Sequence, residues 1–138
     1  MIRNKKGFTL VELLAVIVIL AIILAIAVPG ISNMMDNSKK SAFEADAKMI
    51  ITGLEYQNLE ASLGQASEVV VGVLNGTALT NLGANPANYT TVKVVALSPL
   101  EICVETPSNS KFGAQKALVT KTTVNHSVAG TCATYTKP

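Results

Sequence analysis

The sequence predicts an α+β protein in which one long N-terminal helix packs on a small antiparallel β-sheet head. Residues 8–63 are apolar or show helical periodicity, whereas Thr, Val, Asn and Gly become frequent after residue 65 and the helical pattern disappears. Four segments follow from this reading: a basic prefix (1–7), an apolar helix (8–30), an amphipathic helix (31–64) and a β-rich globular head (65–138).

The apolar helix is long enough to cross a membrane. From Phe8 to Val28 the only polar side chains are those of Thr9 and Glu12. Such a run spans roughly 31 Å at about 1.5 Å per residue, against a hydrocarbon core of about 30 Å. The sequence therefore predicts a single N-terminal membrane span.

The prefix carries Arg3, Lys5 and Lys6, which predict a cytoplasmic N-terminus. A cleaved secretory signal would have a shorter apolar region and a polar, small-residue cleavage site after it. A plain signal anchor fits the length and the charges but leaves Glu12 without a role. A third interpretation places a cleavage site before the apolar run, between Gly7 and Phe8.

The third interpretation rests on a motif. Residues 6–14 read KGFTLVELL, and the apolar run that follows ends at Pro29. This arrangement resembles the prepilin signature of type IV pilins and of the related pseudopilins of type II secretion and DNA-uptake machines. The resemblance covers about the first thirty residues. It implies that a membrane-embedded prepilin peptidase cuts between Gly7 and Phe8 and then methylates the new amine of Phe8.

Glu12 is expensive to hold in an apolar helix, which makes it a candidate functional residue. After the cut, the Phe8 amine would be a new positive charge four residues away, on the same helix face. That amine can pair with Glu12 of its own chain or of a neighbouring subunit. The sequence leaves both pairings open, and the family resemblance favours the second, which would set the axial offset of an incoming subunit.

The remaining apolar residues suit either lipid or the same segments of other subunits in a filament. Pro29 lacks an N–H and Gly30 adds conformational freedom, so we expect the helix to bend or fray there. Two interpretations stay open for this point. One is a kink at the membrane surface, and the other is a segment that unwinds on assembly, as the resemblance suggests.

Helical spacing resumes from Ile31 to Leu63 and should end at Gly64, a candidate C-cap glycine. A main stripe of apolar or small residues comprises Met35, Ser38, Ala42, Ala45, Met49, Thr52, Tyr56, Leu59 and Leu63. A second stripe, which widens the first, comprises Phe43, Ala47, Ile50 and Leu54. We expect the outer part of this helix to pack on a sheet. Pairs of opposite charge four residues apart are Asp36–Lys40 and Glu44–Lys48.

The β-rich region contains five candidate strands separated by turn-rich stretches: Glu68–Leu74, Tyr89–Leu97, Leu100–Glu105, Ala117–Val124 and Thr131–Thr136. A head of this size can form only a small hydrophobic core, so we expect a covalent cross-link to stabilise it. Cys103 and Cys132 are its candidates, with buried free thiols as the alternative. The family resemblance supports the disulfide.

Nothing in the sequence indicates catalysis, a cofactor or a metal centre, and we expect His126 to lie in an exposed loop. The formal net charge is +2, from 11 basic and 9 acidic residues; removing residues 1–7 leaves 8 basic against 9 acidic, a net charge of −1. The basicity is therefore a topology signal, and no specific nucleic-acid site is evident. DNA contact would have to rest on lysines such as Lys93, Lys111, Lys116 and Lys121.

The resemblance implies a non-enzymatic structural subunit of a helical homo-oligomeric filament, a type IV pilus that serves in adhesion, motility or DNA uptake. Its precursor would sit in the cytoplasmic membrane, and the assembled filament would be extracellular. Prepilin peptidase, an assembly platform and a motor ATPase are partners by analogy. One alternative is a pseudopilin of a secretion or DNA-uptake machine, and another is a monomeric membrane-anchored binding protein.

Overall fold

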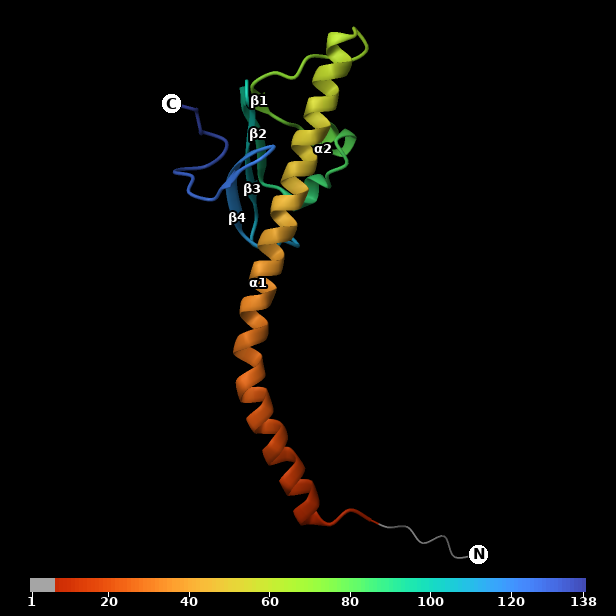
Figure 1. Ribbon diagram of the computed structural model, residues 1–138, viewed down its shortest axis with the longest axis vertical. Coiled ribbons are helices and arrows are strands. Elements are labelled where there is room, and N and C mark those ends of the chain that lie inside the picture. The colour runs from red at the N-terminus through yellow and green to blue at the C-terminus, as the bar shows by residue number, and fades with distance from the viewer. Residues whose placement is uncertain (1–6) are drawn as a thin grey trace, which may run out of the picture. The chain divides into compact units, whose positions relative to one another are not determined.

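The computed structural model describes residues 7–138, so Arg3, Lys5 and Lys6 of the predicted basic prefix lie outside the described residues. The chain forms one long helix followed by a five-stranded antiparallel sheet (Figure 1), which confirms the predicted α+β class. Two compact units divide between Asn37 and Ser38. We describe them separately, as the N-terminal unit (7–37) and the globular unit (38–138).

Helix α1 runs from Leu10 to Ser62 and includes Pro29. Proline has no N–H to donate to the carbonyl of Ala25, so one helical hydrogen bond is missing at this point. The chain nevertheless stays helical through Pro29 and Gly30 and does not fray there. A kink or an unwinding at these two residues stays a prediction.

In the globular unit, one face of α1 packs on the sheet. Its buried side chains are Phe43, Ala47, Ile50, Ile51 and Leu54. All of these except Ile51, which neither predicted stripe included, belong to the second predicted stripe. The predicted main stripe is exposed instead, with Tyr56 65% and Leu59 59% exposed. Both stripes have helical spacing, but only one can face the sheet. The second stripe is apolar throughout, whereas the first includes the polar Ser38 and Thr52.

Helix α1 ends at Ser62, and the predicted C-cap glycine, Gly64, follows directly after this end. Gly64 has a φ of +74°, the left-handed conformation that glycine adopts without a steric penalty. Its N–H donates to the carbonyl of Ala61 at 2.9 Å, and the N–H of Gln65 donates to the carbonyl of Glu60 at 3.0 Å. These two bonds form a Schellman motif, which satisfies carbonyls that the helix end would otherwise leave unpaired.

Two short helices, α2 (Gly76–Asn81) and η1 (Pro86–Asn88), lie where the sequence predicts turns. Each begins with an asparagine cap. The side-chain oxygen of Asn75 accepts a first-turn N–H at 2.8 Å, and that of Asn85 accepts one at 3.0 Å. Such caps favour helical turns over open ones. Leu79 of α2 is buried in the core, which explains why this stretch is ordered against the sheet.

The sheet has the strand order β1-β2-β3-β4-β5, and every neighbouring pair is antiparallel. Its strands are β1 (Gly72–Val73), β2 (Thr91–Leu97), β3 (Leu100–Thr106), β4 (Gln115–Thr120) and β5 (Val124–Asn125). Cys103 in the central strand β3 lies opposite Lys93 of β2 and Leu118 of β4.

Three of the predicted strands differ from the structure. The strand predicted at Glu68–Leu74 shrinks to β1, and the one predicted at Ala117–Val124 divides into β4 and β5 at a turn after Thr120. The strand predicted at Thr131–Thr136 is wrong, because these residues form turns and irregular chain. Cys132 and Tyr135 of this segment pack on the sheet face instead of pairing at its edge.

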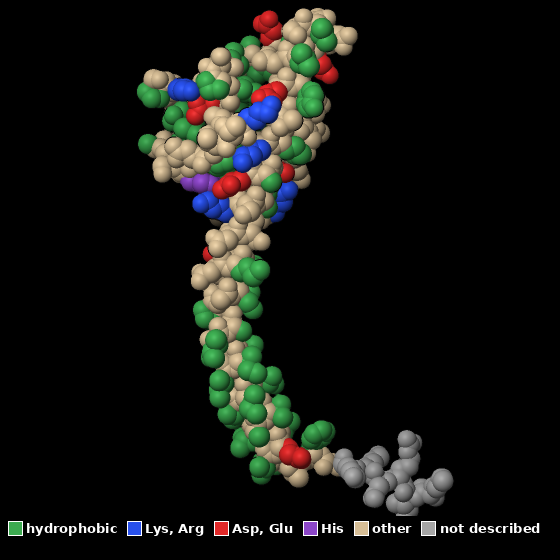
Figure 2. All heavy atoms as spheres, viewed as in Figure 1, with side chains coloured by type: hydrophobic (Ala, Val, Ile, Leu, Met, Phe, Trp, Pro, Cys, Tyr) green, Lys and Arg blue, Asp and Glu red, His purple; other side chains and the backbone are tan. Residues whose placement is uncertain are grey.

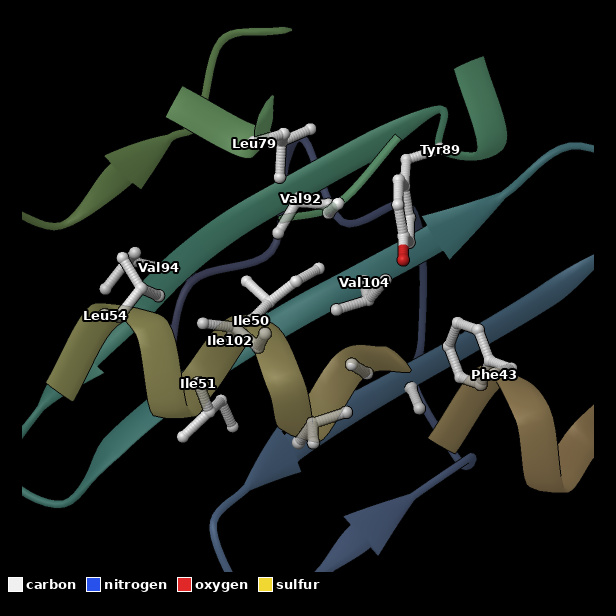
Figure 3. Close-up of a cluster of buried hydrophobic side chains, with 14 of the residues drawn as sticks. Phe43, Ile50, Ile51, Leu54, Leu79, Tyr89, Val92, Val94, Ile102 and Val104 are labelled. Carbon is white, nitrogen blue, oxygen red and sulfur yellow. The ribbon is translucent and has the colours of Figure 1, made fainter. Parts of the chain in front are cut away.

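The main core lies between α1 and one face of the sheet (Figure 3). Its sheet side is formed by Val92, Val94, Ile102, Val104, Ala117 and Val119, all of them at most 1% exposed. Tyr89 adds a polar contact, because its hydroxyl donates to the carboxylate of Asp46 on α1. Burial, together with the neighbouring carboxylate, raises the pKa of Tyr89, so the phenol stays protonated and remains a donor.

A smaller core covers the opposite face of the sheet. There the disulfide predicted between Cys103 and Cys132 is present, with a Cα–Cα distance of 5.3 Å, and Val95 and Val128 pack beside it. The carboxylate of Glu105 accepts the N–H of Cys132 at 3.0 Å. The C-terminal segment therefore covers this sheet face, which explains why residues on both faces of β3 are buried.

We predict that Ile50→Ala destabilises the globular unit by about 2–5 kcal/mol, because it leaves a cavity against the sheet. Tyr56→Ala on the same helix should change the free energy of unfolding by less than about 0.5 kcal/mol, because the side chain is exposed. Urea denaturation of the detergent-solubilised full chain measures both. Equal losses for the two variants would contradict the assignment of the buried stripe.

Candidate functional site

The predicted cleavage point lies just before α1. Gly7 and Phe8 are both exposed, and the side chain of Phe8 is 89% exposed. No atom lies within 4 Å of the position that a Cβ on Gly7 would occupy. The peptide bond between the two residues is therefore open to a partner. Cleavage at Gly7 and methylation of Phe8 stay predictions.

Glu12 has a partner that the sequence prediction missed. Its carboxylate oxygen Oε2 accepts the N–H of Thr9 at 3.0 Å and the hydroxyl of Thr9 at 2.9 Å. In return, the Thr9 hydroxyl oxygen accepts the N–H of Glu12 at 3.2 Å. This reciprocal arrangement is a capping box, in which the two residues satisfy helix N–H groups that have no partner within the helix. Thr-x-x-Glu before an apolar run is the signal that predicts it.

The capping box changes what Glu12 can do in the uncleaved chain. There the Phe8 nitrogen is a neutral peptide N–H, so no amine is present for Glu12 to neutralise. Within residues 7–138 the hydrogen bonds to Glu12 all end on Oε2. A carboxylate has two oxygens, so Oε1 can accept a further donor while the cap stays closed. The pairing of Glu12 with a Phe8 amine, of its own chain or of a neighbouring subunit, therefore stays a prediction.

The N-terminal unit exposes a continuous apolar surface (Figure 2). Every large apolar side chain from Phe8 to Val28 is more than half exposed. The helix is also long and apolar enough to cross a membrane, by length and composition. Burying one such side chain fully is worth about 1.5–3 kcal/mol, so this surface is strongly unfavourable in water. It needs lipid or protein around it.

The head lysines considered for DNA contact are held within the globular unit. Lys93 donates to the carbonyls of Ala133 and Tyr135 at 3.1 and 2.7 Å, and Lys116 donates to the carbonyl of Gly130. The other two face acidic groups: Lys121 lies 2.7 Å from a carboxylate oxygen of Glu55, and Lys111 lies 4.0 Å from one of Asp46. Lys93 and Lys116 are therefore bound to backbone carbonyls of the C-terminal segment, whereas Lys111 and Lys121 are exposed and lie beside acidic groups.

His126 does not lie in an exposed loop as predicted. It is half-buried, with its Nε2 3.0 Å from Oε1 of Glu44, and its ring lies 6.0 Å from that of Phe43, centroid to centroid. The position after β5 brings it against α1, which a lone histidine in a polar stretch does not reveal. Among residues 7–138, no cluster of three or more His, Cys, Asp or Glu is placed to hold a metal ion.

Comparison with known proteins identifies the N-terminal segment. Residues 2–28 match the family model described as the prokaryotic N-terminal methylation motif. Over 58 residues the chain is 36% identical to the type II secretion system core protein G of Pseudomonas aeruginosa, an alignment that covers 42% of this chain and 41% of that protein. The chain thus spans less than half the length of this relative.

Two further relatives come from Thermus thermophilus. The chain is 31% identical over 90 residues to the type IV narrow pilus major component PilA5, which covers 64% of this chain and 78% of that protein. It is 30% identical over 105 residues to the type IV wide pilus major component PilA4, which covers 74% and 72% of the two chains. No solved structure matches the chain.

We predict that Thr9→Val loosens the first turn of α1 by about 1 kcal/mol, because it removes the hydroxyl from the capping box. The N–H of Glu12 should then exchange with solvent several-fold faster, which hydrogen exchange of the detergent-solubilised chain measures. Thr9→Ser keeps the hydroxyl and is the control. Unchanged exchange in the valine variant would contradict the role of the cap.

Proposed function

Because the chain belongs to the type IV pilin family, we propose that it is the structural subunit of a type IV pilus, assembled from the membrane by packing of its N-terminal helices. The two Thermus pilus components match it along more than 70% of their own lengths, which reaches beyond the motif into the globular unit. These relatives are named as filament components, which fits a structural and non-enzymatic role.

One observation carries the proposal: the segment from Phe8 to Val28 exposes its apolar side chains, and α1 holds a single carboxylate in its first turn. In the precursor, lipid would cover the apolar surface, with the N-terminus on the cytoplasmic side. In the filament, the same helices of neighbouring subunits would cover it. Small residues in the run, such as Ala15, Ala21 and Ala25, permit close helix approach.

Glu12 would then select the position of each added subunit. Prepilin peptidase would cut after Gly7 and methylate the Phe8 amine, which keeps a positive charge. A buried carboxylate without a counter-charge is strongly destabilising, so an incoming amine that reaches Glu12 stabilises one axial offset over others. The capping box supports this proposal because it orients the carboxylate through Oε2 and leaves Oε1 available. An assembly platform and a motor ATPase would act on this subunit by analogy.

A pseudopilin of a secretion or DNA-uptake machine is the second candidate, and the identity with the Pseudomonas secretion protein favours it. That identity is confined to 58 residues, whereas the pilus components align over 90 and 105. Electron microscopy with an antibody to the globular unit distinguishes the two: long surface fibres that carry this chain indicate a pilus.

Removing the negative charge of Glu12 tests its proposed role in assembly. Glu12→Gln keeps the reciprocal cap, because glutamine also serves in capping boxes, but it removes the negative charge. We expect the variant to insert and to be processed normally, yet to form few or no filaments, as Glu12→Val should. Immunoblots measure processing, and electron microscopy counts filaments. Abundant filaments from Glu12→Gln would show that capping, not charge pairing, is the role of Glu12.

The mature N-terminus of the native protein tests the proposed cleavage after Gly7. Mass spectrometry of the native protein should find a chain that begins at an N-methylated Phe8. Gly7→Leu should stay uncleaved and absent from filaments, because a bulky side chain would obstruct the cleavage point, and Gly7→Ala is the milder control. An intact Met1 in native material would instead indicate a monomeric anchored binding protein.

A further inference from the structure

The last residues of the chain, 127–138, cover the sheet without joining it. We call them the C-terminal strap, and Figure 1 shows them on the side of the sheet away from α1. Within residues 7–138, no backbone–backbone hydrogen bond joins the strap to a strand. Val128 and Cys132 are its buried residues, and most of the others are exposed. The strap is therefore attached to the sheet at few points.

Side chains of the sheet provide the polar attachments. Lys93 and Lys116 donate to strap carbonyls. The carboxylate of Glu105 accepts a strap N–H at 3.0 Å, and that of Glu101 lies 2.6 Å from the ammonium of Lys137. Each of these contacts replaces a contact with water and so gives only a modest net stabilisation. The disulfide is therefore the main attachment of the strap.

The core between α1 and the sheet contains no residue of the strap. Its buried members extend from Phe43 to Val119, and the last residue packed against it is Val124. The strap contributes instead to the smaller core on the other face, where Val128 and Cys132 pack. Removing the strap from the sheet would therefore leave every side chain of the main core with its present neighbours.

The sheet face beneath the strap is largely polar. It shares the side of Cys103, because side chains opposite each other or two residues apart point the same way. Glu105 and Lys116 lie directly opposite each other there, and opposite charges across strands are stabilising. Val95 and Leu118 are the sheet's apolar contributions to the smaller core. The charged residues of this face are Lys93, Glu101, Glu105 and Lys116. A face of this kind tolerates water, as one face of many antiparallel sheets does.

We propose that the C-terminal strap is a redox-controlled cover, which leaves the sheet when a dithiol reduces the Cys103–Cys132 disulfide while the main core stays folded. A thiolate of the dithiol attacks one sulfur and breaks the S–S bond, and the other cysteine leaves as a thiolate that takes up a proton. The second thiol of the dithiol then displaces the remaining cysteine. The protein gains two electrons and two protons, and the dithiol becomes a cyclic disulfide.

The disulfide can be reached only when the strap opens. Cys103 and Cys132 are both 0% exposed, so a dithiol meets no accessible sulfur in the closed state. A segment with few buried contacts opens locally more often than the whole unit unfolds. Reduction also lowers the stability of the unit, because the cross-link restricts the unfolded chain. It nevertheless removes no side chain from the main core.

Hydrogen exchange of the detergent-solubilised full chain, with and without dithiothreitol, tests the release. We expect reduction to speed the exchange of strap amides several-fold, including the Cys132 N–H that Glu105 accepts, while the amides of β2, β3 and β4 keep their protection. Faster exchange in the strap and the strands alike would overturn the proposal, because the disulfide would then hold the whole unit together. Unchanged exchange in the strap would overturn it as well.

The rate of reduction shows which opening admits the dithiol. The chain has only two cysteines, so alkylation after timed reduction, followed by mass spectrometry, reports on this disulfide alone. Lys93→Met with Lys116→Met removes contacts to strap carbonyls and should speed reduction several-fold. Lys121→Met is the control, because Lys121 pairs with Glu55 on α1, and it should leave the rate unchanged.

Ile50→Ala separates release of the strap from unfolding of the unit. Ile50 is fully buried in the main core, so its truncation promotes global unfolding without changing the strap. Its reduction rate should equal that of the wild type. Acceleration as large as that of the double lysine variant would overturn the proposal, because the disulfide would then be reduced in the unfolded chain. Strap release concerns the globular unit alone, so neither result bears on the proposed role in a filament.

Discussion

The packing of one face of α1 on the sheet is the interaction on which the globular unit depends. Phe43, Ile50 and Leu54 lie in the interior and link the helix to strands β2, β3 and β4. The same helix carries an unpartnered apolar surface in the N-terminal unit. One continuous helix therefore serves two environments, since a folded core surrounds its later turns while lipid or other subunits must surround its earlier ones.

This division explains why the first turn of α1 is chemically distinct. The N–H groups at a helix start have no helical partner and would be unsatisfied in an apolar phase. Thr9 and Glu12 satisfy two of them, so the polar residues in the run have a structural role before any cleavage takes place. The proposed charge pairing adds a second role to Glu12 without requiring the cap to open, because a carboxylate has two acceptor oxygens.

The globular unit is small, and its sheet is covered on both faces. On one side lies α1, and on the other lies the C-terminal segment, held by the disulfide and by carbonyl contacts from Lys93 and Lys116. Covering both faces increases the fraction of buried surface in a domain that would otherwise be marginal. It also leaves the short edge strand β1, and the valines beside it, as apolar surface that the fold itself does not cover.

The sequence by itself determined the α+β class, the apolar N-terminal run and the end of α1 near Gly64, and it left Cys103 and Cys132 as the candidates for a disulfide. These features depend on local composition, on the backbone freedom of glycine and on the presence of only two thiols. Tertiary structure alone decided which of the two helical stripes is buried, so that Ile50 lies in the core while Tyr56 is exposed. It also decided that the C-terminal segment covers a sheet face and does not add a strand, and that His126 meets Glu44. Each of these depends on contacts between residues far apart in the chain, and local periodicity carries no information about which partner a surface will meet.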